Sequence, residues 1–386
     1  MKVCDLTQFY SPLSGGVKRY LEEKRKYAYR TGHQHLLIVP GKQSERCESQ
    51  EGTTYTIASP LVSKTSRYRA LLNLNAVEEI LEREKPDVIE SSDPYQLAWK
   101  AIASGEGLRI PVVGFYHSHF PEAYLRTTMK YFGETAVKIV MEIAKNYVCS
   151  LYNRFRCTFV SSQGLADLLT GWGVENVVLC ELGVDTEVFK RATDKSITRT
   201  ELKIPKDAKL LLYVGRLAAE KNVKTLLKAF SRLFQKTPDR FHLLVVGDGQ
   251  YRDQLIALQK ETHAVTWLRY CSEQETLAKI YRAADLFVHP SVQETFGLVA
   301  LESQACGTPV VGIRGSYMDR IIFADQSSWA DENSPESLAN AIDALSKTDL
   351  EAAGDKASCR VTNRYAWSSV FERMFGTYEK IRQDPC

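Results

Sequence analysis

The sequence predicts an α/β protein with two Rossmann-like domains whose parallel sheets face an interdomain cleft. At 386 residues the chain is too long for one ordinary hydrophobic core. Short runs rich in Val, Ile and Leu alternate with longer segments of helical period, which is typical of parallel sheets covered by helices on both faces. The alternation restarts at Leu210 after the polar stretch Lys190–Asp207, so we expect two sheets.

The N-terminal domain, residues 1–190, is expected to alternate strands with helices such as Val17–Thr31 and Arg69–Glu84. Its predicted strands are Val3–Leu6, His35–Val39, Tyr55–Ala58, Asp87–Glu90, Val112–Tyr116, Cys157–Ser161 and Val177–Glu181. Strands that end in Gly or Ser and lead directly into helices recur in both halves of the chain. Open parallel sheets bind ligands at these carboxyl ends, where helix N-termini suit an anionic diphosphate.

The C-terminal domain, residues 191–367, repeats this organisation. Its predicted strands are Leu210–Val214, His242–Val246, Val265–Arg269, Leu286–His289 and Pro309–Gly312. Its predicted helices are Ser196–Lys203, Val223–Gln235, Tyr251–Glu261, Glu273–Ala283, Gly297–Ala305 and Pro335–Ala344. A last helix, Ser368–Arg382 within residues 368–386, is expected to pack back across both domains.

Composition narrows the class of protein. Hydrophobic residues make up 44% and charged residues 25%, as in soluble globular proteins. A net charge of +3 is too small to indicate a nucleic-acid partner. No apolar run reaches the roughly 18 residues that a membrane span needs, and the N-terminus lacks a secretory signal pattern. We therefore expect a cytoplasmic protein, with peripheral contact at the inner membrane face left open. No Cys or His spacing indicates a metal site.

Two glycine-containing loops are candidate phosphate sites. Gly15 and Gly16 precede the first helix, where glycine permits close backbone approach to a ligand, although such pairs are also common in ordinary turns. After the strand ending at Gly215, Arg216 and Lys221 lie at a helix start, where the helix dipole disfavours cations. A polyanion between them would explain this placement. An ion pair between Lys221 and Glu220 or another acid is the alternative.

Two further elements carry candidate polar groups. Glu294 precedes a helix expected to begin near Phe296, and Glu302 lies about two turns into it, so both carboxylates would share a face. The first amides of that helix are free to hold a phosphate, but Glu302 could equally be a satisfied polar contact. His117 and His119 end a buried strand, where a histidine can donate to a sugar hydroxyl or be a satisfied core residue.

Together these motifs resemble retaining glycosyltransferases of family 4, which have the GT-B fold. The matching elements, in chain order, are Gly15-Gly16, His117, Gly183-Val-Asp-Thr-Glu-Val-Phe189, Gly215-Arg-Leu-Ala-Ala-Glu-Lys221, Val246-Gly-Asp-Gly249, Glu294 to Glu302, and Gly307-Thr-Pro-Val-Val311. The resemblance implies transfer of a hexose from a UDP- or GDP-linked sugar, such as GDP-mannose, to a lipid or glycan acceptor. The N-terminal domain would lie on the acceptor side, and the C-terminal domain would bind the nucleotide-sugar.

The resemblance also implies the role of each site residue. Catalytic roles fall to His117, Glu294, Arg216 and Lys221. Donor-binding roles fall to Gly15, Gly16, Arg216, Lys221, Phe296, Gly297, Leu298 and Glu302. Arg216 and Lys221 would receive the diphosphate, Glu302 the ribose, and Glu294 and His117 the donor sugar. No cofactor is implied, and a metal is not required because the cations carry the positive charge.

The segment Phe120–Tyr152, which mixes aromatic and basic residues, is similar to the subgroup that contains mannosyl- and sulfoquinovosyl-transferases with lipid acceptors. The segment could lie on an anionic membrane, although interspersed acids favour a solvated helix face. The chain departs from the family at Gly315–Asp319, where Asp319 stands for the usual Glu, and at Ala324–Ala330, which lacks glycine. A non-catalytic nucleotide-binding GT-B subunit and a nucleotide-sugar epimerase are therefore alternatives.

Overall fold

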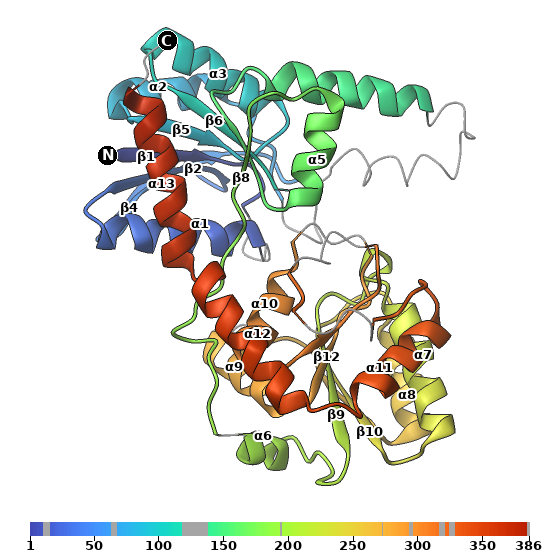
Figure 1. Cartoon of the computed structure of the whole chain (residues 1–386). Helices are drawn as coiled ribbons and strands as arrows, with labels where there is room; N and C mark the ends of the chain where they lie inside the picture. Colours follow the sequence, from blue (N-terminus) through green and yellow to red (C-terminus); the bar gives the residue numbers. More distant parts are fainter. Residues whose placement is uncertain are drawn as a thin grey trace. The chain divides into compact units, whose positions relative to one another are not determined.

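A computed structural model describes residues 1–10, 16–62, 68–117, 138–193, 195–271, 273–292, 296–315, 321–323 and 329–383. The chain divides into two compact units (Figure 1). The first comprises Met1–Leu182 together with Val370–Cys386, and the second comprises Gly183–Ser369. Each unit is a sheet of largely parallel strands with helices packed against it, as the sequence predicts.

The sheet of the first unit has eight strands in the order β3-β4-β2-β1-β5-β6-β7-β8. The bounds are β1 Lys2–Leu6, β2 Gln34–Gly41, β3 Glu45–Ser49, β4 Gly52–Ala58, β5 Val88–Ser91, β6 Val112–Tyr116, β7 Thr158–Val160 and β8 Val177–Leu179. All pairs are parallel except β3 with β4, which form an antiparallel hairpin at the sheet edge. The sequence did not indicate β3 because every one of its residues is exposed.

The helices of the first unit cover the sheet. Their bounds are α1 Gly16–Arg30, α2 Leu74–Glu84, α3 Gln96–Leu108, α5 Gln163–Trp172 and α13 Trp367–Gln383, and residues 138–152 are also helical. The prediction that a helix begins at Arg69 is wrong. Arg69 forms a bridge with Leu61, and the Asn73 side chain caps α2 by accepting a hydrogen bond from the Ala76 amide at 3.2 Å.

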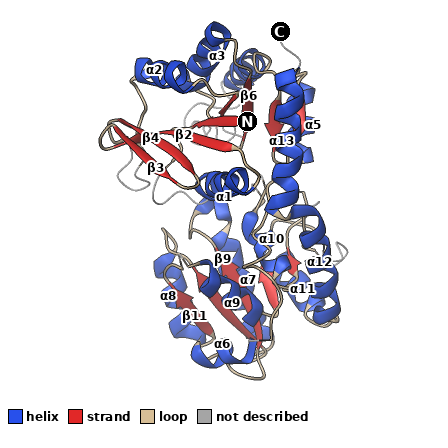
Figure 2. Ribbon diagram, turned by 90° about the vertical axis from the view of Figure 1, so that its left-hand side faces the viewer, coloured by secondary structure: helices blue, strands red, loops and turns tan. Residues whose placement is uncertain are grey.

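Helices α1 and α13 lie side by side (Figure 2). The ring of Tyr27 on α1 packs against Phe371 and Phe375 on α13, with centroid distances of 5.6 and 5.1 Å. Aromatic pairs of this kind contribute about 0.5–1.5 kcal/mol beyond the area that they bury. The C-terminal helix is therefore part of the core of the first unit from Val370 onward.

The sheet of the second unit has five parallel strands in the order β11-β10-β9-β12-β13. The strands are β9 Lys209–Val214, β10 Phe241–Val246, β11 Val265–Leu268, β12 Leu286–Val288 and β13 Val310–Val311. The helices are α6 Lys195–Glu201, α7 Val223–Lys236, α8 Arg252–Thr262, α9 Gln274–Ala283, α10 Leu298–Ala305, α11 Pro335–Leu345 and α12 Leu350–Tyr365. Each predicted strand of this unit is present.

Both sheets reverse their winding direction at one point. In the first unit the chain leaves β1 toward β2 and later returns to place β5 on the other side of β1. In the second unit β9 lies in the same way between β10 and β12. Such switch points leave a crevice at the carboxyl ends of the strands, where open α/β sheets bind ligands. The candidate residues should therefore be sought after β1 and β5, and after β9 and β12.

No helix among the described residues is long and apolar enough to cross a membrane.

Candidate functional site

The loop after β9 carries the predicted cations at the switch point of the second unit. Arg216 is exposed, and its guanidinium forms an ion pair with Glu220 at 2.8 Å. The sequence left open an ion pair between Lys221 and Glu220, whereas in the structure Glu220 pairs with Arg216. Because both side chains are exposed, the pair contributes at most about 1 kcal/mol and can be exchanged for an anionic ligand. Lys221 is half-buried at the end of a 3₁₀ turn, Ala219–Lys221.

This loop is attached to the segment that follows β12. The Asn222 side chain donates a hydrogen bond to the Pro290 carbonyl at 2.8 Å, and the Ser291 hydroxyl donates to the Glu220 carbonyl at 3.1 Å. Asn222 adopts the left-handed conformation, φ 53°, which places a break between the 3₁₀ turn and α7. The chain just before Glu294 is thereby brought to the cation loop, whereas Glu294 itself lies outside the described residues.

Glycine is required where the loops after β9 and β10 meet. At Gly247, φ is +144°, and a Cβ atom there would lie 1.9 Å from the Gly215 carbonyl oxygen. At Gly249 a Cβ atom would lie 2.6 Å from the Leu217 carbonyl oxygen. Side chains at either position would push the backbone of the Arg216 loop away. These contacts give a physical reason for the Gly-Asp-Gly element.

Helix α10 begins one residue after the predicted start at Gly297. Gly297, with φ +76°, is its N-cap, and Leu298 is its first helical residue. Phe296 is buried, and its ring lies 6.2 Å from that of Tyr365. Glu302 is therefore one turn into the helix rather than two. The prediction that Glu294 and Glu302 share one face involves Glu294, which lies outside the described residues.

Glu302 is buried and accepts a hydrogen bond from the Tyr281 hydroxyl at 2.9 Å. This is the satisfied polar contact that the sequence left open, and it also orients the carboxylate. Of the departures from the family, Gly315 is described, with φ +81°, whereas Asp319 and residues 324–328 lie outside the described residues.

The first unit has a cavity of about 180 Å³ at the carboxyl ends of β5 and β6. Gly16 is the exposed first residue of α1, and Val17 lines the cavity, whereas Gly15 and His119 lie outside the described residues. Aromatic rings form much of the lining and His117 contributes a polar group. The described lining residues are Phe9, Val17, Tyr68, Ser92, Pro94, Phe115, His117 and Tyr152.

His117 is held in a fixed orientation at this cavity. Its ring stacks on Phe115 at 3.8 Å with an interplanar angle of 22°, and its Nε2 shares a hydrogen bond with the Ser92 hydroxyl at 3.1 Å. Burial, together with the nearby charge of Lys24, lowers the pKa of His117 to about 3. The imidazole is therefore neutral at physiological pH and suits hydrogen bonding to a polar ligand rather than charge pairing.

Asp93, which the sequence analysis did not select, is fully buried between two cavity-lining residues, Ser92 and Pro94. Its Oδ2 accepts a hydrogen bond from the Gln8 amide at 2.8 Å, which ties the end of β5 to the segment after β1. Oδ1 has no hydrogen-bond partner among the described residues. Burial raises the pKa of Asp93 to about 8. The signal in the sequence was Ser91-Ser92-Asp93 at the carboxyl end of a buried strand.

The raised pKa of Asp93 predicts a pH-dependent stability. A carboxyl group with a pKa near 8 when folded and near 4 when unfolded contributes stability below pH 4 that is lost as pH rises toward 8. Asp93→Asn keeps an acceptor for the Gln8 amide and cannot ionise. Between pH 4 and pH 8 the ionisation of Asp93 lowers the free energy of unfolding by up to about 1.4 kcal/mol per pH unit. We expect Asp93→Asn to lose this part of the pH dependence. Urea unfolding at pH 5 and pH 7.5 measures this, and equal slopes in both proteins would contradict it.

Comparisons with known proteins agree with the resemblance to family 4 glycosyltransferases. A family model described as Glycosyltransferase Family 4 matches residues 14–188, and one described as Glycosyl transferases group 1 matches residues 194–358. A GDP-mannose-dependent alpha-(1-6)-phosphatidylinositol dimannoside mannosyltransferase of Mycobacterium tuberculosis is 30% identical over 345 residues, covering 89% of this chain and 87% of the relative.

Solved structures share the fold. Sucrose-phosphate synthase from Thermosynechococcus elongatus superposes with a TM-score of 0.78 at 20% identity, over 98% of each chain. The Anabaena protein HepE, in complex with UDP, has a TM-score of 0.75 at 18% identity, over 98% of this chain and all of HepE (100%). The chain therefore belongs to glycosyltransferase family 4 and is a glycosyltransferase with the GT-B fold.

Proposed function

We propose that this glycosyltransferase moves a hexose, with retention of anomeric configuration, from a UDP- or GDP-linked sugar to a lipid or glycan acceptor. The observation that carries the proposal is the loop of Arg216 and Lys221 at the β9–β12 switch point, attached to the segment after β12. Arg216 and Lys221 lie in the loop that precedes α7, where the helix dipole favours an anion. The exposed ion pair of Arg216 with Glu220 can be exchanged for such a ligand. A diphosphate fits this arrangement.

In this proposal Arg216 and Lys221 bind the two phosphates, and the amides of Gly297 and Leu298 at the N-terminus of α10 add partial positive charge. Glu302, already oriented by Tyr281, binds the ribose hydroxyls. Catalysis is then mainly electrostatic, because cations and amides stabilise the departing nucleotide as positive charge develops on the sugar. The departing phosphate takes the proton of the acceptor.

The remaining assignments concern the donor sugar. We assign Glu294 and the neutral imidazole of His117 to sugar hydroxyls, and Gly15, Gly16 and Phe296 to close contacts with the donor. Support comes from His117, which the structure presents at a cavity with its ring fixed by Phe115 and Ser92. A fixed neutral donor discriminates hydroxyl positions better than a mobile one.

The donor and the acceptor are tested together. The mycobacterial relative is named a GDP-mannose-dependent phosphatidylinositol dimannoside mannosyltransferase, whereas the HepE complex contains UDP. We expect one UDP- or GDP-hexose to release nucleotide above background, and the rate to rise with a glycolipid acceptor. Nuclear magnetic resonance of the product would report the anomeric configuration. Absence of transfer from every UDP- and GDP-sugar by folded protein would contradict the proposal.

The proposed charge distribution makes a divalent metal unnecessary. Because Arg216 and Lys221 neutralise the leaving group, we expect transfer rates in excess EDTA to stay within about two-fold of those in Mg²⁺. A coupled assay of nucleotide release measures both conditions. A loss of activity in EDTA that Mg²⁺ or Mn²⁺ restores would show that Arg216 and Lys221 do not neutralise the leaving group on their own.

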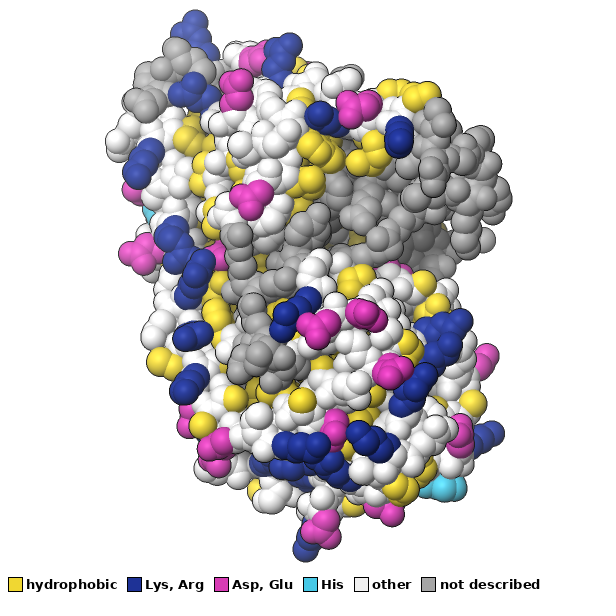
Figure 3. All heavy atoms as spheres, turned by 45° about the vertical axis from the view of Figure 1, so that its right-hand side comes forward, with side chains coloured by type: hydrophobic (Ala, Val, Ile, Leu, Met, Phe, Trp, Pro, Cys, Tyr) yellow, Lys and Arg dark blue, Asp and Glu magenta, His cyan; other side chains and the backbone are white. Residues whose placement is uncertain are grey.

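Peripheral membrane contact is the second part of the proposal. Helix residues Ile139 and Ile143 are 58% and 63% exposed, and they lie one turn apart on the same helix face. Exposed apolar pairs of this kind can enter the interfacial region of a bilayer. Charged side chains of both signs are otherwise interspersed on the face drawn in Figure 3, so charge alone does not select a membrane.

We expect replacement of both Ile139 and Ile143 by serine to weaken binding to anionic phospholipid vesicles by roughly a hundred-fold or more, because each isoleucine contributes about 1.5–3 kcal/mol when buried and each 1.4 kcal/mol is ten-fold in affinity. Ile197→Ser is the matched control, since Ile197 is 62% exposed on α6 of the other unit. Vesicle co-flotation measures the effect. Equal flotation of all three proteins would contradict membrane contact at this helix.

A further inference from the structure

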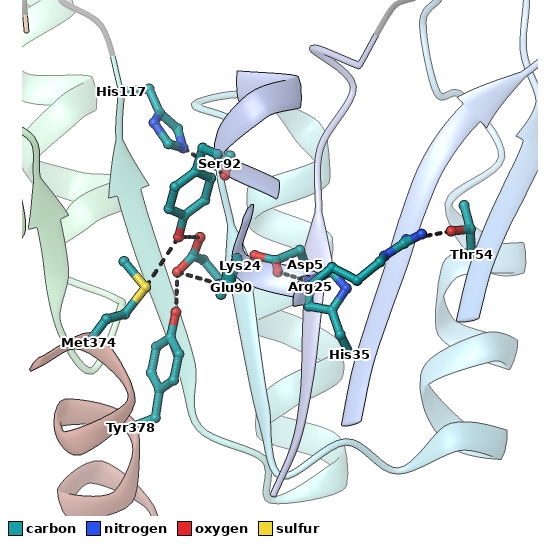
Figure 4. A network of polar contacts seen from close by, with 11 residues as sticks. Asp5, Lys24, Arg25, His35, Thr54, Glu90, Ser92, His117, Met374 and Tyr378 are labelled. Carbon is teal, nitrogen blue, oxygen red and sulfur yellow. Dashed lines mark hydrogen bonds and ion pairs between the residues drawn. The ribbon is translucent and has the colours of Figure 1, made fainter. Parts of the chain in front are cut away.

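A buried group of charged side chains lies beneath the cavity of the first unit (Figure 4). The Lys24 cluster consists of Asp5, Lys24, His35 and Glu90, none of which is more than 2% exposed. The Lys24 ammonium lies 2.8 Å from Asp5 and 3.2 Å from Glu90. His35 contacts the other Asp5 oxygen at 2.6 Å. The cluster joins α1 to strands β1, β2 and β5.

Glu90 also connects two helices through its two carboxylate oxygens. Its Oε1 accepts a hydrogen bond from the Tyr20 hydroxyl of α1 at 2.8 Å, and its Oε2 accepts one from the Tyr378 hydroxyl of α13. Burial raises the pKa of both tyrosines, so both phenols stay protonated and act as donors. Burial is also the main cause that raises the pKa of Glu90 to about 7, with Asp5 adding to it and Lys24 opposing it.

Tyr20 connects the Lys24 cluster to the cavity, because its hydroxyl binds Glu90 and its ring contacts two residues that line the cavity. Its ring lies edge-on to His117, with centroids 5.2 Å apart and planes at 68°, and edge-on to Phe115 at 5.2 Å. The Tyr20 side chain thus contacts Glu90 through its hydroxyl and His117 through its ring. Tyr20 follows Val17 by one helical turn, and Val17 lines the cavity. Phe115 and Tyr20 thus contact two sides of the His117 ring.

The geometry points to Tyr20 as a positioning residue for His117: its hydroxyl is anchored by Glu90, and Tyr378 of the C-terminal helix holds the same carboxylate. This inference rests on the sugar-binding role proposed above for His117. A buried ion pair contributes little net stability but strongly selects one arrangement of the elements it joins. Here the selected arrangement fixes the rotation of α1. It thereby fixes the position of the Tyr20 ring that His117 contacts.

The connection from Tyr378 to His117 is testable because it runs through hydroxyl groups. Tyr20→Phe and Tyr378→Phe each delete one hydroxyl while keeping the ring. We expect each variant to lower kcat roughly ten-fold with an unchanged KM for the donor, because small misplacements of a contacting group are costly in rate. The double variant should lose little more than either single variant, since both act through Glu90.

Tyr55→Phe is the matched control, because the Tyr55 hydroxyl donates to a carboxylate of the same unit, Glu84, at 2.6 Å but far from the cavity in the sheet order. This variant should keep its kcat even if it is less stable. The second readout is the nuclear magnetic resonance signal of the His117 ring after selective labelling. We expect that signal to shift in Tyr20→Phe and in Tyr378→Phe, and to stay in place in Tyr55→Phe.

The possible failures can be told apart with His117→Ala. If that variant loses transfer while Tyr20→Phe keeps both its kcat and its His117 signal, the positioning inference is overturned and the proposed function stands. If His117→Ala transfers sugar as well as the wild type, the assigned role of His117 is wrong and the inference falls with it. Shifted His117 signals together with reduced kcat in both tyrosine variants support the inference.

Discussion

Replacing Lys221 by alanine should lower kcat by roughly a hundred- to a thousand-fold without unfolding the protein. In the proposed site its ammonium stabilises charge that develops only as the nucleotide departs, and loss of one such group typically has this effect. Lys221 is half-buried in a short turn rather than in the core, so we expect little change in unfolding free energy. Initial rates of nucleotide release measure the effect.

The control is Lys224→Ala, which removes the same charge from an exposed position on α7. It should retain most of the activity, because a solvated charge beyond the loop contributes little to the transition state. If Lys221→Ala transferred sugar at the wild-type rate, the diphosphate role would be excluded. If both variants lost activity equally, general electrostatics rather than a specific phosphate contact would explain the loss.

Replacing Gly247 by alanine should destabilise the second unit by about 3 kcal/mol or more. The new Cβ would lie 1.9 Å from the Gly215 carbonyl oxygen, a contact between backbones that no side-chain rotation relieves. The backbone conformation, φ +144°, adds strain for any residue other than glycine. Because Gly215 begins the cation loop, nucleotide affinity should fall as well. Urea unfolding and a nucleotide titration measure the two effects.

Gly171→Ala provides the opposite expectation. Gly171 lies within α5, and a Cβ atom there would meet nothing within 4 Å. Alanine in a helix is favoured over glycine, so this variant should keep or gain up to about 1 kcal/mol. If Gly247→Ala were as stable as the wild type, the close approach of the two loops would not describe the folded protein.

The sequence predicted the strands that carry apolar runs, and it missed β3, which carries none. Runs such as Leu210–Val214 are apolar at nearly every position because helices cover both faces of the sheet. By contrast, β3 is an exposed edge hairpin with the polar sequence Glu-Arg-Cys-Glu-Ser, which carries no alternating pattern. The start of α10 was misplaced for a different reason, since Gly297 adopts a left-handed conformation that a helical pattern does not reveal.

For the site, the sequence predicted a phosphate-binding role for the loop of Arg216 and Lys221 because the glycine and both cations lie close together in the sequence. It did not identify the Lys24 cluster, because its ion pairs join residues far apart in the chain. A signal was nevertheless present. Asp5 and Glu90 interrupt strands that are otherwise apolar, and a buried carboxylate requires a partner. Which cation provides it depends on how α1 packs, and only the structure shows that.

The account depends most on the capture of a nucleoside diphosphate by Arg216 and Lys221, and calorimetric titration of the protein with UDP, GDP and ADP tests this most directly. We expect UDP or GDP to bind, and Arg216→Ala and Lys221→Ala each to weaken that binding at least roughly ten-fold, as expected for loss of a charge-assisted contact. Failure of every nucleotide to bind the folded protein, or affinity in both variants equal to that of the wild type, would contradict it.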